Sequence, residues 1–70
     1  MQEILINREY VELFKILKFE SLASSGGEAK ILIADGKVEV NGEVETRKRR
    51  KIIAGDVIKV FDDEYRVVAA

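Results

Sequence analysis

The first third of the chain changes from a strand-like to a helical pattern of apolar residues. Residues 3–7 are rich in β-branched side chains and are followed by polar residues, which predicts a short strand. From Tyr10 onwards, apolar residues recur three and four positions apart, and charged residues fall between them. This spacing predicts an amphipathic helix over roughly residues 9–18.

The start of a second helix is predicted by a capping signal. Residues 20–27 have the small and polar side chains of a connection. Ser25, followed three positions later by Glu28, fits a capping box, in which each side chain accepts a hydrogen bond from a backbone N–H of the first turn. The free N–H groups at Ser25-Gly26-Gly27 could also contact a phosphate. We favour the structural cap, because Glu28 places a negative charge where the phosphate would lie.

The second helix also has a predicted apolar side and a predicted end. Gly36 stands where a helix C-cap is expected. Lys30 and Lys37 are not part of the apolar stripe that faces the core, and we expect Lys30 to lie on the exposed side of the helix. The stripe consists of Ala29, Leu32 and Ile33.

The pattern of the next segment predicts a hairpin. Residues 38–40 alternate between apolar and polar side chains, and Asn41-Gly42 is the strongest short signal for a type I′ turn. A two-residue loop would place Val44 opposite Glu39, on the polar face of the sheet. We therefore expect the return strand to be short or irregular.

A second hairpin is predicted near the end of the chain. Ile52 and Ile53 are expected to return to the core, and Gly55-Asp56 to turn the chain into the last strand pair. With Asp62-Asp63 as the loop, Val60 would face Tyr65. The acidic side chains at this tip are explained by ordinary turn chemistry rather than by a metal site.

Together these elements predict a fold of the α+β class. Two helices would pack on a small, mainly antiparallel sheet of four or five short strands. Seventy residues suffice for one domain, which we place at residues 1–70, and no repeat or linker divides them. Most of the aromatic residues stand at apolar positions of the predicted elements, and we assign these to the core. Base stacking is therefore not indicated by the sequence.

The composition excludes several classes of function. The chain contains neither Cys nor His, so it lacks a disulfide framework, a thiolate metal site and the commonest general base. We expect neither an enzyme, nor a cofactor, nor a small-molecule substrate. The chain has neither an apolar run long enough to span a membrane nor a secretory signal, and we expect a cytoplasmic monomer.

The charge pattern points to a polyanionic partner. The net charge is only −1, yet residues 47–51 are five consecutive cations, which we expect to form an exposed loop or edge strand and to contribute nothing to the core. Residues 30–51 have a net charge of +3 between two flanks of −2 each. A segregated basic patch attracts nucleic acid locally. A solvated loop, a localisation signal or a dock for an acidic protein surface would show the same run.

The order of these motifs resembles the S4 RNA-binding domain over residues 10–60, about three quarters of the chain. Ser25 opens the second helix and Ala29 follows, as in that family. Residues 36–42 then match the family's glycine-valine-x-valine-asparagine-glycine stretch with one insertion, and residues 55–60 match its closing strand. Gly26 departs from the pattern, because most S4 domains place an arginine there.

The glycine-rich helix start and the basic run look most like the small free-standing bacterial S4-like proteins of the YaaA and YbcJ type. This resemblance implies a non-catalytic RNA-binding protein that grips structured RNA, including ribosomal RNA during ribosome assembly. The alternative is an adaptor that docks its basic run on an acidic partner protein. The residues predicted to contact RNA are Ser25, Lys30, Lys37, Arg47, Lys48, Arg49, Arg50 and Lys51.

Overall fold

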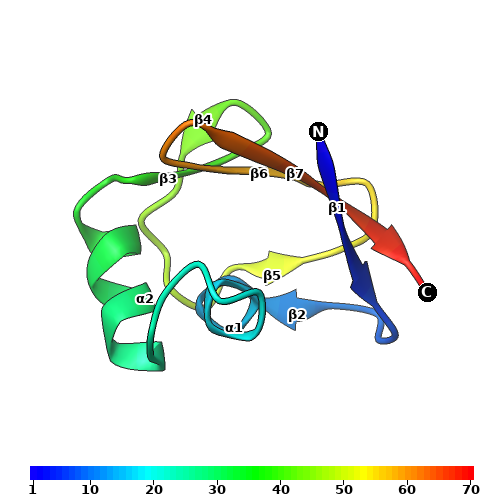
Figure 1. Ribbon diagram of the computed structural model, residues 1–70, viewed down its shortest axis with the longest axis horizontal. Coiled ribbons are helices and arrows are strands. Elements are labelled where there is room, and N and C mark those ends of the chain that lie inside the picture. The colour runs from blue at the N-terminus through cyan, green and yellow to red at the C-terminus, as the bar shows by residue number, and fades with distance from the viewer.

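The computed structural model describes all of residues 1–70 and contains two short helices packed beside a sheet (Figure 1). This arrangement confirms the predicted α+β class. In chain order the elements are β1 (Gln2–Ile6), β2 (Val11–Glu12), α1 (Leu13–Phe19), α2 (Gly26–Ala34), β3 (Val38–Val40), β4 (Glu43–Val44), β5 (Lys51–Ile52), β6 (Val57–Val60) and β7 (Asp63–Ala69).

The main sheet has five strands in the order β1-β7-β6-β3-β4. Adjacent strands in this sheet are antiparallel except for β1 and β7, which run parallel although they come from opposite ends of the sequence. In Figure 1 these two strands cross in projection, and both point towards the lower right, where the C-terminus lies. A second, two-stranded sheet joins β2 to β5 next to α1.

The core lies between one face of the main sheet and the two helices. Strand residues alternate strictly, so that Ile58 and Val60 of β6 are buried while Lys59 between them is not. The helices contribute the opposite side of the core. Its helical members are Leu13, Ile16, Leu17, Ala29 and Ile33. The other face of the sheet is not covered by a helix. This explains why charged residues alternate with buried apolar residues along the strands.

The first helix is shorter than predicted. It begins at Leu13 rather than near residue 9, because Val11 and Glu12 are extended and pair with Ile52 and Lys51. Apolar spacing over so few residues does not distinguish a helical turn from a short strand that leads into a helix. The pairing of Glu12 with Lys51 joins the start of α1 to the end of the basic run, residues 47–51.

The second helix follows the predicted signals closely. Ser25 Oγ accepts a hydrogen bond from the Glu28 N–H at 3.1 Å, so Ser25 is the N-cap. The Glu28 carboxylate accepts from the N–H and hydroxyl of Ser24 instead of from Ser25. At the other end, Gly36 has a φ of +75°, and its N–H donates to the Ile33 carbonyl in a Schellman-type cap.

One predicted hairpin is confirmed and the other has a different register. Asn41 and Gly42 both have positive φ, and Glu39 lies opposite Val44 as expected. In the last hairpin Val60 pairs with Asp63 instead of Tyr65, so the loop is Phe61-Asp62. The shift places Tyr65 opposite Ile58 instead, with both side chains buried.

The assignment of most aromatic residues to the core was wrong. Phe19 and Phe61 are 65% and 63% exposed, and Tyr10 is 43% exposed. Phe14 is half-buried and packs against the edge of the core. Ile53, also predicted to be buried, is 49% exposed, because the short strand β5 ends at Ile52.

Candidate nucleic-acid interface

The basic run is held against the first turn of α1 by its own backbone. The N–H groups of Leu13 and Phe14 donate to the carbonyls of Arg50 and Lys48 at 2.9 and 3.1 Å. The first N–H groups of a helix have no partner within the helix, so the run satisfies them in place of a side-chain cap. Lys51 then enters β5. The run is thus an ordered segment whose side chains project from a fixed backbone.

Glu45 anchors the same segment from inside the protein. Its side chain is only 7% exposed, and its carboxylate accepts hydrogen bonds from the backbone N–H of Arg47, from Nε and Nη2 of the Arg47 guanidinium, and from Arg50. These bonds lower the pKa of Glu45 to about 2, with those from Arg47 contributing most. The expectation that the run contributes nothing to folding was therefore wrong for Arg47 and Arg50.

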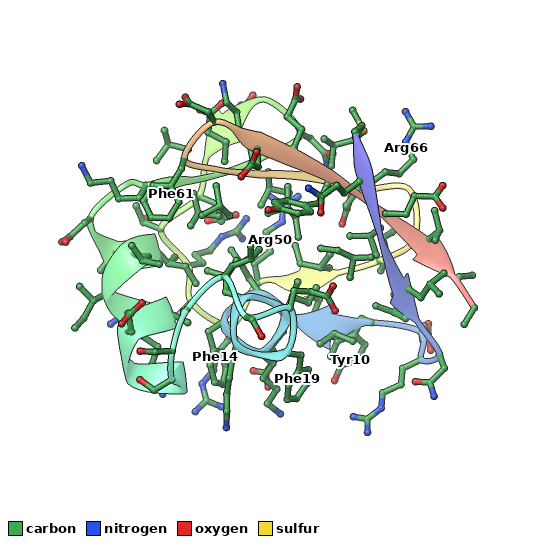
Figure 2. The ribbon with its side chains drawn as sticks, in the orientation of Figure 1. Tyr10, Phe14, Phe19, Arg50, Phe61 and Arg66 are labelled. Carbon is green, nitrogen blue, oxygen red and sulfur yellow. The ribbon has the colours of Figure 1, made fainter.

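Glu45 was not predicted from the sequence. Its only signal was an acidic residue two positions before a block of cations, and the sequence alone does not show that the carboxylate turns inward. The effect on the run is large, because two of its five cations have a carboxylate partner at 2.9 and 2.8 Å. Figure 2 shows Arg50 pointing into the space between helices and sheet.

The remaining cations of the run face solvent. The side chain of Arg49 is 71% exposed, and its nearest carboxylate oxygen, on Glu12, is 3.7 Å away. Lys48 and Lys51 are also exposed and make no ion pair. These three side chains retain charge that a polyanion could neutralise.

Phe14 lies at the centre of cations from three different segments. The Lys30 ammonium is 4.7 Å from the centre of its ring, the Arg49 guanidinium 5.8 Å and the Lys15 ammonium 5.9 Å. These distances are within the range of cation–π attraction. Lys15 was not predicted, since nothing in the sequence shows that the basic run folds back onto α1. Lys30 is half-buried rather than exposed, and its ammonium lies over this ring.

We call the resulting cluster the basic surface. Its members are Lys15, Lys30, Lys48, Arg49 and Lys51. Arg47 borders it, with a guanidinium that is bound to Glu45 yet 74% exposed. In Figure 2, Phe14 marks its position along the lower edge of the molecule, next to α1.

Two predicted contact residues, Ser25 and Lys37, lie just outside the two ends of α2. Ser25 caps the helix, and the neighbouring Glu28 already brings a carboxylate to that end. The hydrogen bonds from Ser24 lower the pKa of Glu28, which keeps that negative charge in place. Lys37 lies beyond the opposite end of α2, and the contacts that join the basic surface do not include it.

Neither a metal centre nor a membrane span is visible in the fold. No group of three acidic, His or Cys residues converges. Neither helix has the length and apolar content that crossing a membrane requires.

The family model of the S4 domain matches residues 4–68. The chain is 50% identical over 60 residues to the candidate RNA-binding protein YbcJ of Escherichia coli (strain K12), covering 86% of each chain. It is 37% identical over 57 residues to the probable ribosome maturation protein RlbA of Bacillus subtilis (strain 168), covering 81% of this chain and 80% of that protein.

Two solved structures share the fold. The solution structure of YbcJ from E. coli, described as having an αL motif involved in RNA binding, superposes with a TM-score of 0.75 at 44% identity, covering 99% of this chain and 89% of that one. The 30S ribosomal protein S4e of Thermoplasma acidophilum superposes with a TM-score of 0.71 at 28% identity, covering 86% of this chain and 32% of that one. S4 domains are RNA-binding and not catalytic, so the prediction that the chain is not an enzyme is confirmed. The chain belongs to the S4 domain family.

Proposed function

We propose that this protein binds structured RNA, with ribosomal RNA as its target, and that the basic surface makes the contact. The observation that carries the proposal is the convergence of cations from α1, α2 and the basic run around Phe14. The names of YbcJ and RlbA support an RNA partner and a link to the ribosome. Ser25 and Lys37, just beyond the two ends of α2, and Arg47, at the border of the basic surface, remain predicted contacts.

The geometry favours recognition of shape and backbone over sequence. An A-form helix hides its base edges in a deep groove and presents phosphates and 2′-hydroxyls instead. Arg49 has a guanidinium that can hold a phosphate through two parallel hydrogen bonds, while the lysines act as point charges. Because the run's backbone is bonded to α1, these groups are arranged before RNA arrives.

The proposal extends to how the protein works as a whole. Residues 1–70 would act as a single monomeric binding unit in the cytoplasm, where ribosomes assemble. The core of 15 buried residues supports one cooperative unit, since it draws on both helices and on the main sheet.

Salt dependence provides the test. If about four to six phosphates are contacted, log K for an RNA hairpin should fall with log salt at a slope of roughly −3 to −5, taking ~0.7–0.9 per phosphate. Fluorescence anisotropy of a labelled ribosomal RNA hairpin at several salt concentrations measures this slope, with duplex DNA of the same sequence as competitor. A flat response, or equal competition by the DNA duplex, would contradict the proposal.

A further inference from the structure

Tyr10 is an exposed aromatic residue at the border of the basic surface. It is 43% exposed, and the ammonium of Lys51 lies 4.9 Å from the centre of its ring. Phe19 and Phe61 are more exposed, but no cation lies over either ring. Tyr10 is therefore the exposed aromatic that the fold places next to the charges expected to hold RNA. In Figure 2 it points outward on the same lower edge as Phe14.

Tyr10 also lines an open hollow beside the start of α1. The other lining residues are Arg8, Glu9, Val11, Glu12 and Lys15. Lys15 belongs to the basic surface, so the hollow is continuous with it. The two cations of the lining are matched by two carboxylates, and Glu12 already pairs with Lys15 at 3.2 Å.

This balance of charge decides what the hollow can accept. A phosphate needs an excess of positive charge, which the neighbouring basic surface has and the hollow lacks. A nucleobase is neutral, has a π face that stacks on an aromatic ring, and carries N–H groups that can donate hydrogen bonds to a carboxylate such as that of Glu9. The hollow therefore suits a base, and the exposed Lys51 beside Tyr10 could hold a phosphate next to that base.

We propose that the hollow at Tyr10 binds one unpaired nucleotide of the RNA, with its base stacked on the Tyr10 ring. This inference rests on the proposed function and narrows the ligand to a duplex with a bulge or an overhang. Bases inside a duplex are stacked on one another, so only an unpaired base can reach the ring. Every base has a π face, and we therefore expect stacking with little sequence preference.

The test compares two RNA hairpins that differ by one nucleotide. Both have the same stem, and one carries a single bulged 2-aminopurine, whose fluorescence is quenched when it stacks. We expect the protein to bind the bulged hairpin about tenfold more tightly and to quench its fluorescence. Tyr10→Leu, which keeps an apolar side chain without an aromatic face, should lose both effects and bind the two hairpins alike.

Three controls make the result specific. Tyr10→Phe should keep the preference, since it keeps the ring, and Phe61→Ala should keep it because Phe61 lies at the hairpin tip on the sheet. A melting curve of Tyr10→Leu checks that the variant is folded. If the unaltered protein binds both hairpins equally, the stacking site is wrong and the RNA proposal stands. If it binds neither hairpin, the RNA proposal itself is wrong. If Tyr10→Leu keeps the preference, the base stacks elsewhere and the inference is overturned.

Discussion

The basic surface and the outer face of the sheet both carry exposed cations, but they differ in what lies next to those cations. On the outer face Lys59 lies between Glu39 and Glu64 on the neighbouring strands, and Arg66 lies opposite Glu3. Cross-strand neighbours of opposite charge largely cancel each other. On the basic surface the half-buried carboxylate of Glu12 pairs with Lys15 and Arg49, and the other three cations make no ion pair.

The difference shows that the placement of cations, rather than their number, makes a surface that attracts a polyanion. The strand pairing of the sheet fixes which residues lie opposite each other, and it places acidic residues opposite Lys59 and Arg66. The basic run has no such partner strand beyond Lys51, and its one strong acidic partner, Glu45, is buried and holds only Arg47 and Arg50. Of the remaining side chains, Arg49 has only Glu12 at 3.7 Å, and Lys48 and Lys51 are exposed without an ion pair.

The largest expected effect comes from removing the anchor of the basic surface. Glu45→Ala should lower the free energy of unfolding by about 3 kcal/mol, because it leaves the partly buried Arg50 guanidinium without an acceptor. A count of charges predicts tighter RNA binding from this variant, whereas we expect weaker binding, since the run loses its fixed geometry. Denaturant unfolding and RNA titration measure the two effects. Glu43→Ala, an exposed carboxylate on β4, is the matched control and should change stability by no more than about 0.5 kcal/mol.

The same anchor should make stability depend on pH in acid. The pKa of Glu45 is lowered from 4.5 to about 2 in the folded protein, so the folded state is favoured above pH 4.5 and loses this advantage as pH falls towards 2. The loss amounts to about 3 kcal/mol, at about 1.4 kcal/mol per pKa unit. Unfolding curves of the protein and of Glu45→Gln across this range should converge at low pH. Parallel curves would show that Glu45 is not the titrating group.

Paired substitutions of equal charge test the comparison itself. Lys48→Gln with Arg49→Gln removes two cations from the basic surface, and we expect at least a tenfold loss of RNA affinity, about 1.4 kcal/mol, with a shallower salt slope. Lys59→Gln with Arg66→Gln removes the same charge from the outer face of the sheet. That variant should bind RNA within about twofold of the unaltered protein, because cations far from the contact are screened. Equal losses from both variants would mean that only net charge matters.

The smallest expected effect lies on the sheet side and concerns stability alone. Phe61 has a φ of +56° at the first loop position of the last hairpin, a conformation that glycine adopts without strain. Phe61→Gly should raise the free energy of unfolding by about 0.5–1 kcal/mol and leave RNA binding unchanged. Asp62→Gly is the control and should not stabilise, since Asp62 does not have positive φ. Thermal unfolding distinguishes the two.

Local signals in the sequence predicted much of the fold because they act within a few residues. The Ser25 cap, the Gly36 end and the Asn41-Gly42 turn each depend on a backbone conformation that neighbouring residues determine. The pairing of β1 with β7 and the docking of the basic run on α1 involve distant segments, and no short pattern encodes them. The register of the last hairpin was mistaken because Phe61 is an unusual residue for a turn.

The candidate site was predicted only in part, because contacts between distant segments decide which of its cations are free. The run of cations is evident in the sequence, but whether each cation is free depends on tertiary contacts. Glu45 takes two of them, and Phe14 gathers Lys15 and Lys30 beside Arg49. The exposure of Tyr10 was missed because an apolar position in a helical pattern became the residue before a strand.

The central claim, that RNA meets the protein at the basic surface, is tested most directly by mapping the contact on the intact protein. Titration of the ¹⁵N-labelled protein with a bulged ribosomal RNA hairpin would report the amide signals that shift. We predict shifts of the amide signals of Leu13, Phe14 and residues 47–51. The signals of residues 57–60 and 63–69, in strands β6 and β7 of the main sheet, should not shift. Shifts concentrated on the sheet strands, with the basic run unmoved, would contradict the account.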